Sequence, residues 1–138
     1  MTDEPYFTHL AEDECWDLLR THPVGRVAWS DGAAVTVLPV NHVVHERTLW
    51  FRTDPDSVLG RLAEGASVAF EADQIDDETR IAWSVLVRGH ASGAEESGID
   101  GRVVPEPWAP GERTLDIRIT VEEISGRVLS GQLPNYGA

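Results

Sequence analysis

Apolar and polar residues alternate in six separate stretches of the chain. In residues 114–124, for example, Leu115, Ile117 and Ile119 share one side of an extended chain, while Asp116 and Arg118 share the other. This period of two is typical of a β-strand with one buried face. The pattern predicts strands at residues 24–30, from residue 35 to a turn at 45–47, and at 48–53, 67–72, 81–91 and 114–124.

Two shorter stretches have helical spacing instead. In residues 10–20, acidic side chains at 12–14 suit the positive amino-terminal end of a helix, and one stripe is apolar: Leu10, Cys15, Leu18 and Leu19. Residues 57–64 predict a second short helix that ends before Gly65. Residues 1–8 are expected to form a loose lead-in, and the segment from residue 126 an irregular tail.

These elements predict a mainly β fold. Six strands joined mostly by tight connections, with two short helices, indicate an antiparallel β-barrel or sandwich with peripheral helices. The chain has 138 residues, with no evident repeat or linker. We therefore expect a single domain over residues 1–138, with its core at about residues 9–129.

The net charge of the chain excludes some classes of binding partner. The formal net charge is −13, with eleven arginines and no lysine. Nucleic acid and anionic membranes are not expected as partners, because both require clustered positive charge. An anionic ligand would need particular arginines, helix amides or hydroxyls. No apolar run approaches the roughly 18 residues of a membrane span, and residues 1–7 do not resemble a secretory signal, so a cytoplasmic location is expected.

Common catalytic and metal-binding patterns are missing from the sequence. His42 and His45 are three residues apart, and without an HExxH motif or a cysteine cluster they predict no metal site. We interpret both as histidines near a solvated turn. No Gly-x-Ser-x-Gly elbow is present, and the single cysteine, Cys15, is interpreted as a packing residue on a helix. No catalytic residue is assigned.

The stretch from residue 35 to residue 62 is the strongest candidate for a binding site. Pro39 interrupts a predicted strand and has no amide proton to donate, as is typical of a sheet edge or a bulge. Thr53 and Ser57 place hydroxyls just before a predicted helix, which suits an anion. Trp108, on a proline-rich loop, is a candidate for covering a planar ligand or a partner chain.

These motifs, in this order, carry a family resemblance that covers about residues 9–129. The sequence places Leu38-Pro39-Val40-Asn41 before Trp50-Phe51-Arg52-Thr53 and Ser57, followed by Trp83-Ser84-Val85 and Pro107-Trp108. The chain resembles the pyridoxamine 5′-phosphate oxidase-like FMN-binding split-barrel family. It is most similar to the pyridoxamine oxidase-related branch that includes nitroimidazole reductase-like proteins.

The resemblance implies a six-stranded antiparallel split barrel that forms a homodimer, with FMN sites between the subunits. It implies that the strand segment Leu38, Pro39, Val40 and Asn41 lies along the isoalloxazine ring, and that Thr53 and Ser57 hold the phosphate. Trp83 and Ser84 would line the base of the FMN site, and Trp108 would approach the flavin of the neighbouring subunit. Val58 stands where the family commonly has a phosphate-binding lysine. FMN binding is therefore weakened or absent unless Arg52 or Arg61 substitutes for that lysine.

The function implied is that of an FMN-dependent oxidoreductase, which transfers hydride through the flavin to an unknown small molecule. One alternative is a dimer that binds or stores flavin without turnover, or that has lost FMN. Another is a deazaflavin-dependent reductase, although the polyanionic tail of a deazaflavin favours a basic groove that this charge balance does not suggest. Pyridoxamine phosphate is not the expected substrate, because the carboxyl-terminal segment lacks the arginine- and histidine-bearing motif that binds it.

Overall fold

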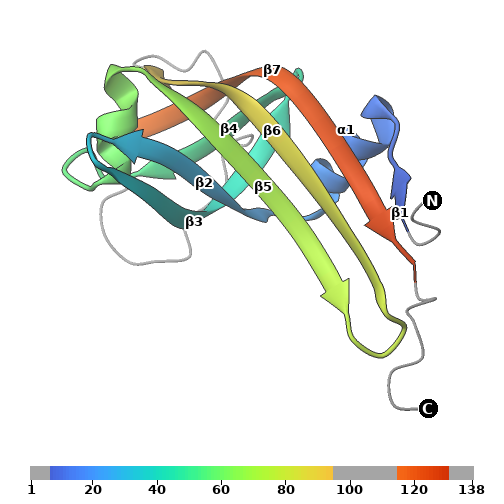
Figure 1. Cartoon of the computed structure of the whole chain (residues 1–138). Helices are drawn as coiled ribbons and strands as arrows, with labels where there is room; N and C mark the ends of the chain where they lie inside the picture. Colours follow the sequence, from blue (N-terminus) through green and yellow to red (C-terminus); the bar gives the residue numbers. More distant parts are fainter. Residues whose placement is uncertain (1–6, 95–114, 131–138) are drawn as a thin grey trace.

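The structure is a computed structural model in which residues 7–94 and 115–130 are described (Figure 1). Trp108 lies outside these ranges. The elements, in chain order, are β1 (Phe7–His9), α1 (Glu12–Thr21), β2 (Val24–Asp31), β3 (Ala34–His45), β4 (Thr48–Thr53), the 3-10 helix η1 (Leu59–Glu64), β5 (Ala66–Asp76), β6 (Ile81–Ala94) and β7 (Leu115–Leu129).

The strands close into an antiparallel barrel. Their order is β7-β4-β3-β2-β5-β6, and β6 pairs again with β7 to complete the circle. The predicted mainly β class and six-stranded antiparallel barrel are therefore confirmed. The short strand β1 adds to the far end of β7, where Thr8 pairs with Val128, so part of the expected loose lead-in is a strand.

β5 and β7 extend furthest beyond the ends that their apolar alternation predicts. β5 continues to Asp76 and β7 to Leu129, whereas the sequence pattern ends near residues 72 and 124. β5 is long because it pairs with β6 without interruption from Ala66↔Ala91 to Asp76↔Ile81. A partner strand satisfies backbone donors and acceptors whether or not the side chains are apolar. The second predicted helix begins at Leu59 and is a 3-10 helix.

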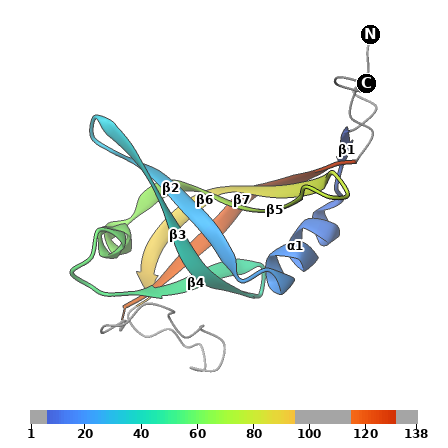
Figure 2. The same ribbon diagram turned by 90° about the horizontal axis from the view of Figure 1, so that it is seen from below.

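Side chains from all six barrel strands fill the barrel interior. Helix α1 closes one end of the barrel (Figure 2). The fully buried residues include Leu49, Phe51, Phe70, Val85, Val87, Ile117 and Ile119. From α1, Cys15, Trp16 and Leu19 join this core. Close approach to β7 requires Gly126, because a Cβ there would lie 2.7 Å from the Cys15 Sγ. Within the described residues, no helix is long and apolar enough to cross a membrane.

The barrel is split between β3 and β4. β3 pairs with β2 from Asp31↔Ala34 to Val24↔Asn41, but it pairs with β4 only from His42↔Phe51 to His45↔Thr48. Beyond His42 the two strands diverge, and η1 lies at the open end (Figure 2). Among the described strands, residues 34–40 of β3 therefore have a strand partner on one edge only.

Candidate functional site

The β3 segment predicted to contact a ligand alternates between two faces of the sheet. Leu38 and Val40 pair with Val27 and Gly25 and point into the core, and Val40 is buried. Pro39 and Asn41 point to the outer face, where Pro39 is exposed. A ligand at this segment would thus meet two of the four side chains, together with the free backbone edge of the strand.

The loop after β4 brings the two predicted hydroxyls together. The Thr53 Oγ1 and the Ser57 Oγ are 2.8 Å apart, and Thr53 is completely buried. The Ser57 Oγ also donates to the Asp54 carbonyl oxygen at 2.6 Å and accepts from the Gly60 amide at 3.1 Å. Gly60 is required because a Cβ there would lie 2.4 Å from the Pro55 carbonyl oxygen. The hydroxyls therefore hold the loop in a compact turn.

Arg52 is not brought together with Thr53 and Ser57. Adjacent residues of a strand point to opposite faces, and Arg52 lies on the outer face of β4, opposite the buried Thr53. Its Nε donates to the Asp116 Oδ1 at 2.7 Å, and Asp116 is itself buried. The pair joins β4 to β7 at the register Arg52↔Asp116.

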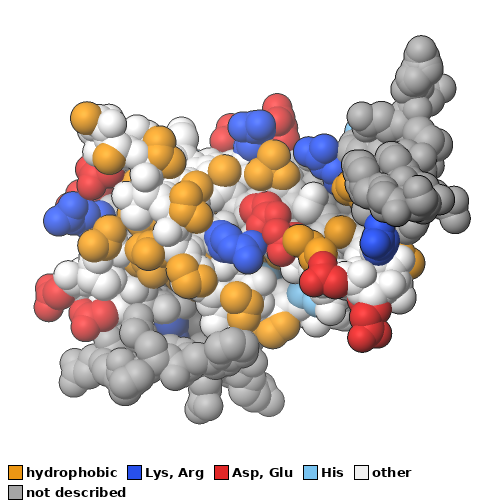
Figure 3. Space-filling view, turned by 60° about the horizontal axis from the view of Figure 1, so that its bottom comes forward, with side chains coloured by type: hydrophobic (Ala, Val, Ile, Leu, Met, Phe, Trp, Pro, Cys, Tyr) orange, Lys and Arg blue, Asp and Glu red, His pale blue; other side chains and the backbone are white. Residues whose placement is uncertain are grey.

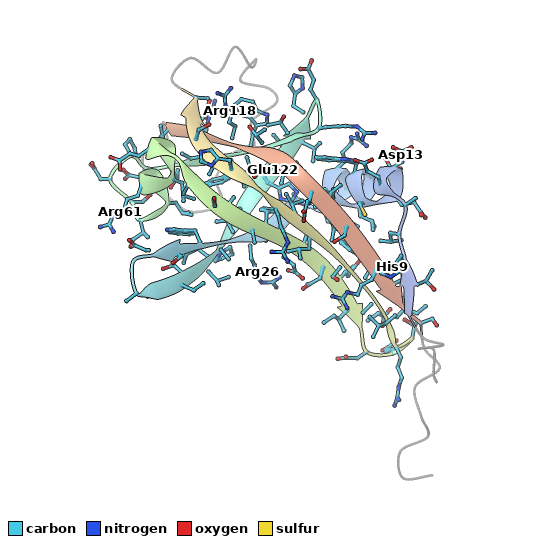
Figure 4. The ribbon with its side chains drawn as sticks, turned by 45° about the horizontal axis from the view of Figure 1, so that its top comes forward. His9, Asp13, Arg26, Arg61, Arg118 and Glu122 are labelled. Atoms are coloured by element: carbon cyan, nitrogen blue, oxygen red, sulfur yellow. The ribbon has the colours of Figure 1, made fainter. Side chains whose placement is uncertain are left out.

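Arg61 lies on η1 at the open end of the split, far from His9 at the opposite end of the molecule (Figure 4). Its side chain is 67% exposed, and its Nη1 is 3.4 Å from the Asp31 Oδ2 at the tip of the β2–β3 hairpin. This exposed ion pair links the two sides of the split. Surface pairs of this kind contribute little to stability.

Trp83 and Ser84 occupy opposite faces of β6. The Trp83 ring meets the His22 ring edge-on at 4.6 Å between centroids, and its Nε1 is 3.4 Å from the Gln74 Oε1. Ser84 lines a shallow pocket on the outer face with His9, Leu86, Ser125, Gly126 and Arg127. β3 and β6 are separated by β2 and β5, and Pro39 is in register with Leu86 rather than with Ser84. At about 4.8 Å per strand, Pro39 and Ser84 are therefore separated by three strand spacings, roughly 14 Å along the sheet, and by a further shift along the strand. One chain alone does not bring these two residues together.

The outer face of β3, β2, β5 and β6 is partly apolar, with charged side chains among the apolar ones (Figure 3). Val35 and Val37 of β3 are strongly exposed on it. Arg26 lies 2.8 Å from the Glu71 Oε1 and 3.3 Å from the Asp73 Oδ2. Burial, together with the neighbouring Asp73 carboxylate, raises the pKa of Glu71 to about 7, although Arg26 acts in the opposite direction.

His42 is a buried residue, and its interpretation as a histidine near a solvated turn is wrong. It is 3% exposed, its Nε2 donates to the Leu19 carbonyl at 2.9 Å, and its ring meets Phe70 edge-on at 4.8 Å. Burial lowers the pKa of His42. Its spacing of two from Val40 and Val44, on the apolar face of the strand, is the signal that identifies it as a core residue. The described residues hold no cluster of three or more His, Cys, Asp or Glu side chains suited to a metal.

Comparison with known proteins identifies the family. A model of the family described as pyridoxamine 5′-phosphate oxidase matches residues 11–128. The "Uncharacterized protein Rv0080" of Mycobacterium tuberculosis is 30% identical over 124 residues, which cover 85% of this chain and 82% of that protein. The FAD binding protein from Mycobacterium smegmatis is 33% identical with a TM-score of 0.75, over 89% of this chain and 98% of that one.

A conserved protein of unknown function from Corynebacterium diphtheriae, DIP1874, is 26% identical with a TM-score of 0.74, over 90% of this chain and 98% of that one. The family model spans most of the chain and includes both sides of the split. This chain therefore belongs to the pyridoxamine 5′-phosphate oxidase family, as the order of its sequence motifs indicated.

Proposed function

We propose that this protein binds a flavin and uses it as an oxidoreductase acting on a small molecule. The observation that carries the proposal is the similarity to the FAD binding protein from Mycobacterium smegmatis, which extends over 89% of this chain at 33% identity. Fold alone does not imply a ligand. Here, sequence identity and a suitable site support the same class of cofactor.

The split between β3 and β4 supports binding of a flavin ring. Residues 34–40 of β3 offer a backbone edge without a strand partner among the described residues. Backbone amides and carbonyls of such an edge can bond to the polar edge of a planar ring. Pro39 interrupts the row of donors, and the exposed Val37 beside it gives the strand apolar surface. These residues suit the isoalloxazine end of the cofactor.

When bound, a flavin supplies hydride transfer, while the protein supplies position and electrostatics. The residues of this chain that would position the ring are the β3 edge and the outer side chains Pro39 and Asn41. We assign no acid or base among the described residues.

We also propose a homodimer with cofactor sites between the subunits. The outer face of β3 supports this, because Val35 is 72% exposed and Val37 is 54% exposed. An apolar patch used by both copies across a twofold axis forms a self-complementary contact. The second copy would also supply residues such as Ser84 that one chain holds at a distance from Pro39. A dimer mass in sedimentation or light scattering is expected, and a monomer would contradict this part of the proposal.

The function is tested by adding FMN or FAD to purified protein. We expect a bound flavin absorption band and a Kd of about 10 µM or tighter. Under anaerobic conditions NADPH or NADH should bleach the band, and an added acceptor should restore it. Urea-unfolded protein serves as the control. Protein that binds neither flavin would overturn the proposal, whereas binding without bleaching by either donor would indicate a carrier.

A further inference from the structure

We infer that the site recognises the ring of a flavin and does not hold its phosphate at the loop between β4 and η1. The inference rests on the proposed flavin binding and deepens it, because it names which part of the cofactor this chain discriminates.

The two hydroxyl protons of the loop are already used. The single Ser57 hydroxyl proton goes to the Asp54 carbonyl oxygen at 2.6 Å. In the 2.8 Å contact between the two hydroxyls, Thr53 must therefore donate to Ser57. The Ser57 oxygen accepts a second bond from the Gly60 amide. Neither hydroxyl proton is left to donate to a phosphate, and Thr53 is completely buried.

Most of the backbone amides in the loop are also used. The amide of Asp56 donates to the Asp54 Oδ1 at 2.8 Å, and the Ser57 amide donates to the Asp54 carbonyl at 3.0 Å. The amides of Gly60 and Arg61 donate to the carbonyls of Ser57 and Val58. η1 is a 3-10 helix of six residues, too short to present the row of free amides that attracts an anion at the start of a long helix.

The charges of the loop oppose a phosphate. Residues 53–65 carry three carboxylates, those of Asp54, Asp56 and Glu64, and one cation, Arg61. That cation faces a fourth carboxylate, Asp31, at 3.4 Å. A phosphate of about two negative charges placed here would meet more like charge than opposite charge. The net charge of −13 adds to this repulsion rather than offsetting it.

The residue at position 58 determines whether the loop offers a cation to the phosphate. Val58 lies on the solvent side of the loop, 45% exposed, with φ −58° and ψ −41°. Any L-residue adopts this backbone conformation, and a long side chain can extend into solvent. A lysine there would add a flexible cation without disturbing the buried Thr53 or the Ser57 hydrogen bonds.

The test compares riboflavin with FMN, which differ only in the phosphate. Flavin fluorescence quenching on titration of the purified protein should give Kd values within about threefold of each other. The FMN value should change little between low and moderate salt. If FMN binds more than about tenfold tighter than riboflavin, the inference is overturned and the proposed function stands. If neither flavin binds, the proposed function fails and the inference fails with it.

Variants at two positions sharpen the test. Val58→Lys should tighten FMN binding by about tenfold and leave riboflavin unchanged, because only FMN offers the new cation a partner. Val58→Met, of similar length without charge, is the matched control and should change neither affinity. Arg61→Ala should leave FMN affinity within about twofold of wild type. A selective loss of FMN binding in Arg61→Ala would show that the loop holds the phosphate and would overturn the inference.

Discussion

Two sides of the same barrel differ in how far their strands pair. β5 and β6 pair over the whole of β5, and β6 and β7 pair over thirteen positions with one bulge between Arg88 and Gly89. β3 and β4 pair over four positions and then separate. The first side is specified by continuous backbone bonding and by buried side chains such as Val85 and Val87.

The second side keeps its shape by other means. There, a turn of hydroxyl bonds at Thr53 and Ser57, the pair Arg52–Asp116 and the buried His42 replace the missing ladder. Each polar interaction of this kind contributes only modestly to the free energy of unfolding, and its contribution depends on how deeply it is buried. The fold thus leaves open the side with the least backbone pairing, and that is the side where we propose that a flavin binds.

The largest expected loss of stability comes from a substitution in the barrel core. Phe70 on β5 is completely buried and contacts the His42 ring, whereas Val35 on β3 is 72% exposed. Phe70→Ala should lower the free energy of unfolding by about 3–5 kcal/mol, and the control Val35→Ala by less than about 0.5 kcal/mol. Urea denaturation of both variants checks this. Similar losses in the two would break the comparison between core and outer face.

A smaller effect is expected at the pair that joins β4 to β7. Arg52→Met leaves the buried Asp116 carboxylate without its cation and should cost about 1–3 kcal/mol of unfolding free energy. Arg61→Met removes an exposed pair and should cost less than about 0.5 kcal/mol. Adding Asp116→Asn to Arg52→Met should restore part of the loss. If thermal melts show equal effects for the two arginines, the assignment of Arg52 to structure is wrong.

The smallest effect concerns pH at the point where β3 and β4 separate. Protonated His42 would need an acceptor for Nδ1, and none lies within reach among the described residues. Its pKa is lower in the folded than in the unfolded state. The unfolded state therefore binds more protons below about pH 6.5, so that stability falls as pH falls through this range.

His42→Gln should flatten this part of the stability curve, and His45→Gln, at a half-exposed position in the turn, should not. Glu71 contributes a slope of the opposite sign. Its pKa is raised in the folded state, so the stability that it contributes to the folded protein is lost as pH rises toward about 7. Glu71 is present in wild type and both variants, so its slope cancels in the comparison. Melting temperatures between about pH 5 and pH 7 give the measurement. Parallel curves for wild type and His42→Gln would exclude the effect.

The sequence predicted most of the barrel, because a strand with one buried face has a period that can be counted. Thr48–Thr53 was predicted to the residue, since a turn precedes it and a loop follows it. The extension of β5 to Asp76 was not, because it depends on the partner strand rather than on its own side chains. The interpretation of His42 as a histidine near a solvated turn is wrong, because its spacing of two from Val40 places it in the core.

The candidate site was predicted less completely. The sequence indicated the Thr53 and Ser57 hydroxyls as candidates for holding an anion, and in the structure these hydroxyls lie 2.8 Å apart. It did not show that the loop itself uses both hydroxyls, since such bonds depend on where the chain turns back. Arg52 and Thr53 are neighbours in a strand and point apart, so they could not both contact one phosphate from the same face. That conflict could have been seen in the sequence.

The single cysteine has a practical consequence. Cys15 is completely inaccessible, and burial together with Glu14 and Glu12 raises the pKa of its thiol. The sequence has no other cysteine. A thiol-specific reagent therefore reacts with one known atom, and only when α1 has moved away from Gly126 on β7. The rate of that labelling therefore measures how often this end of the barrel opens in solution.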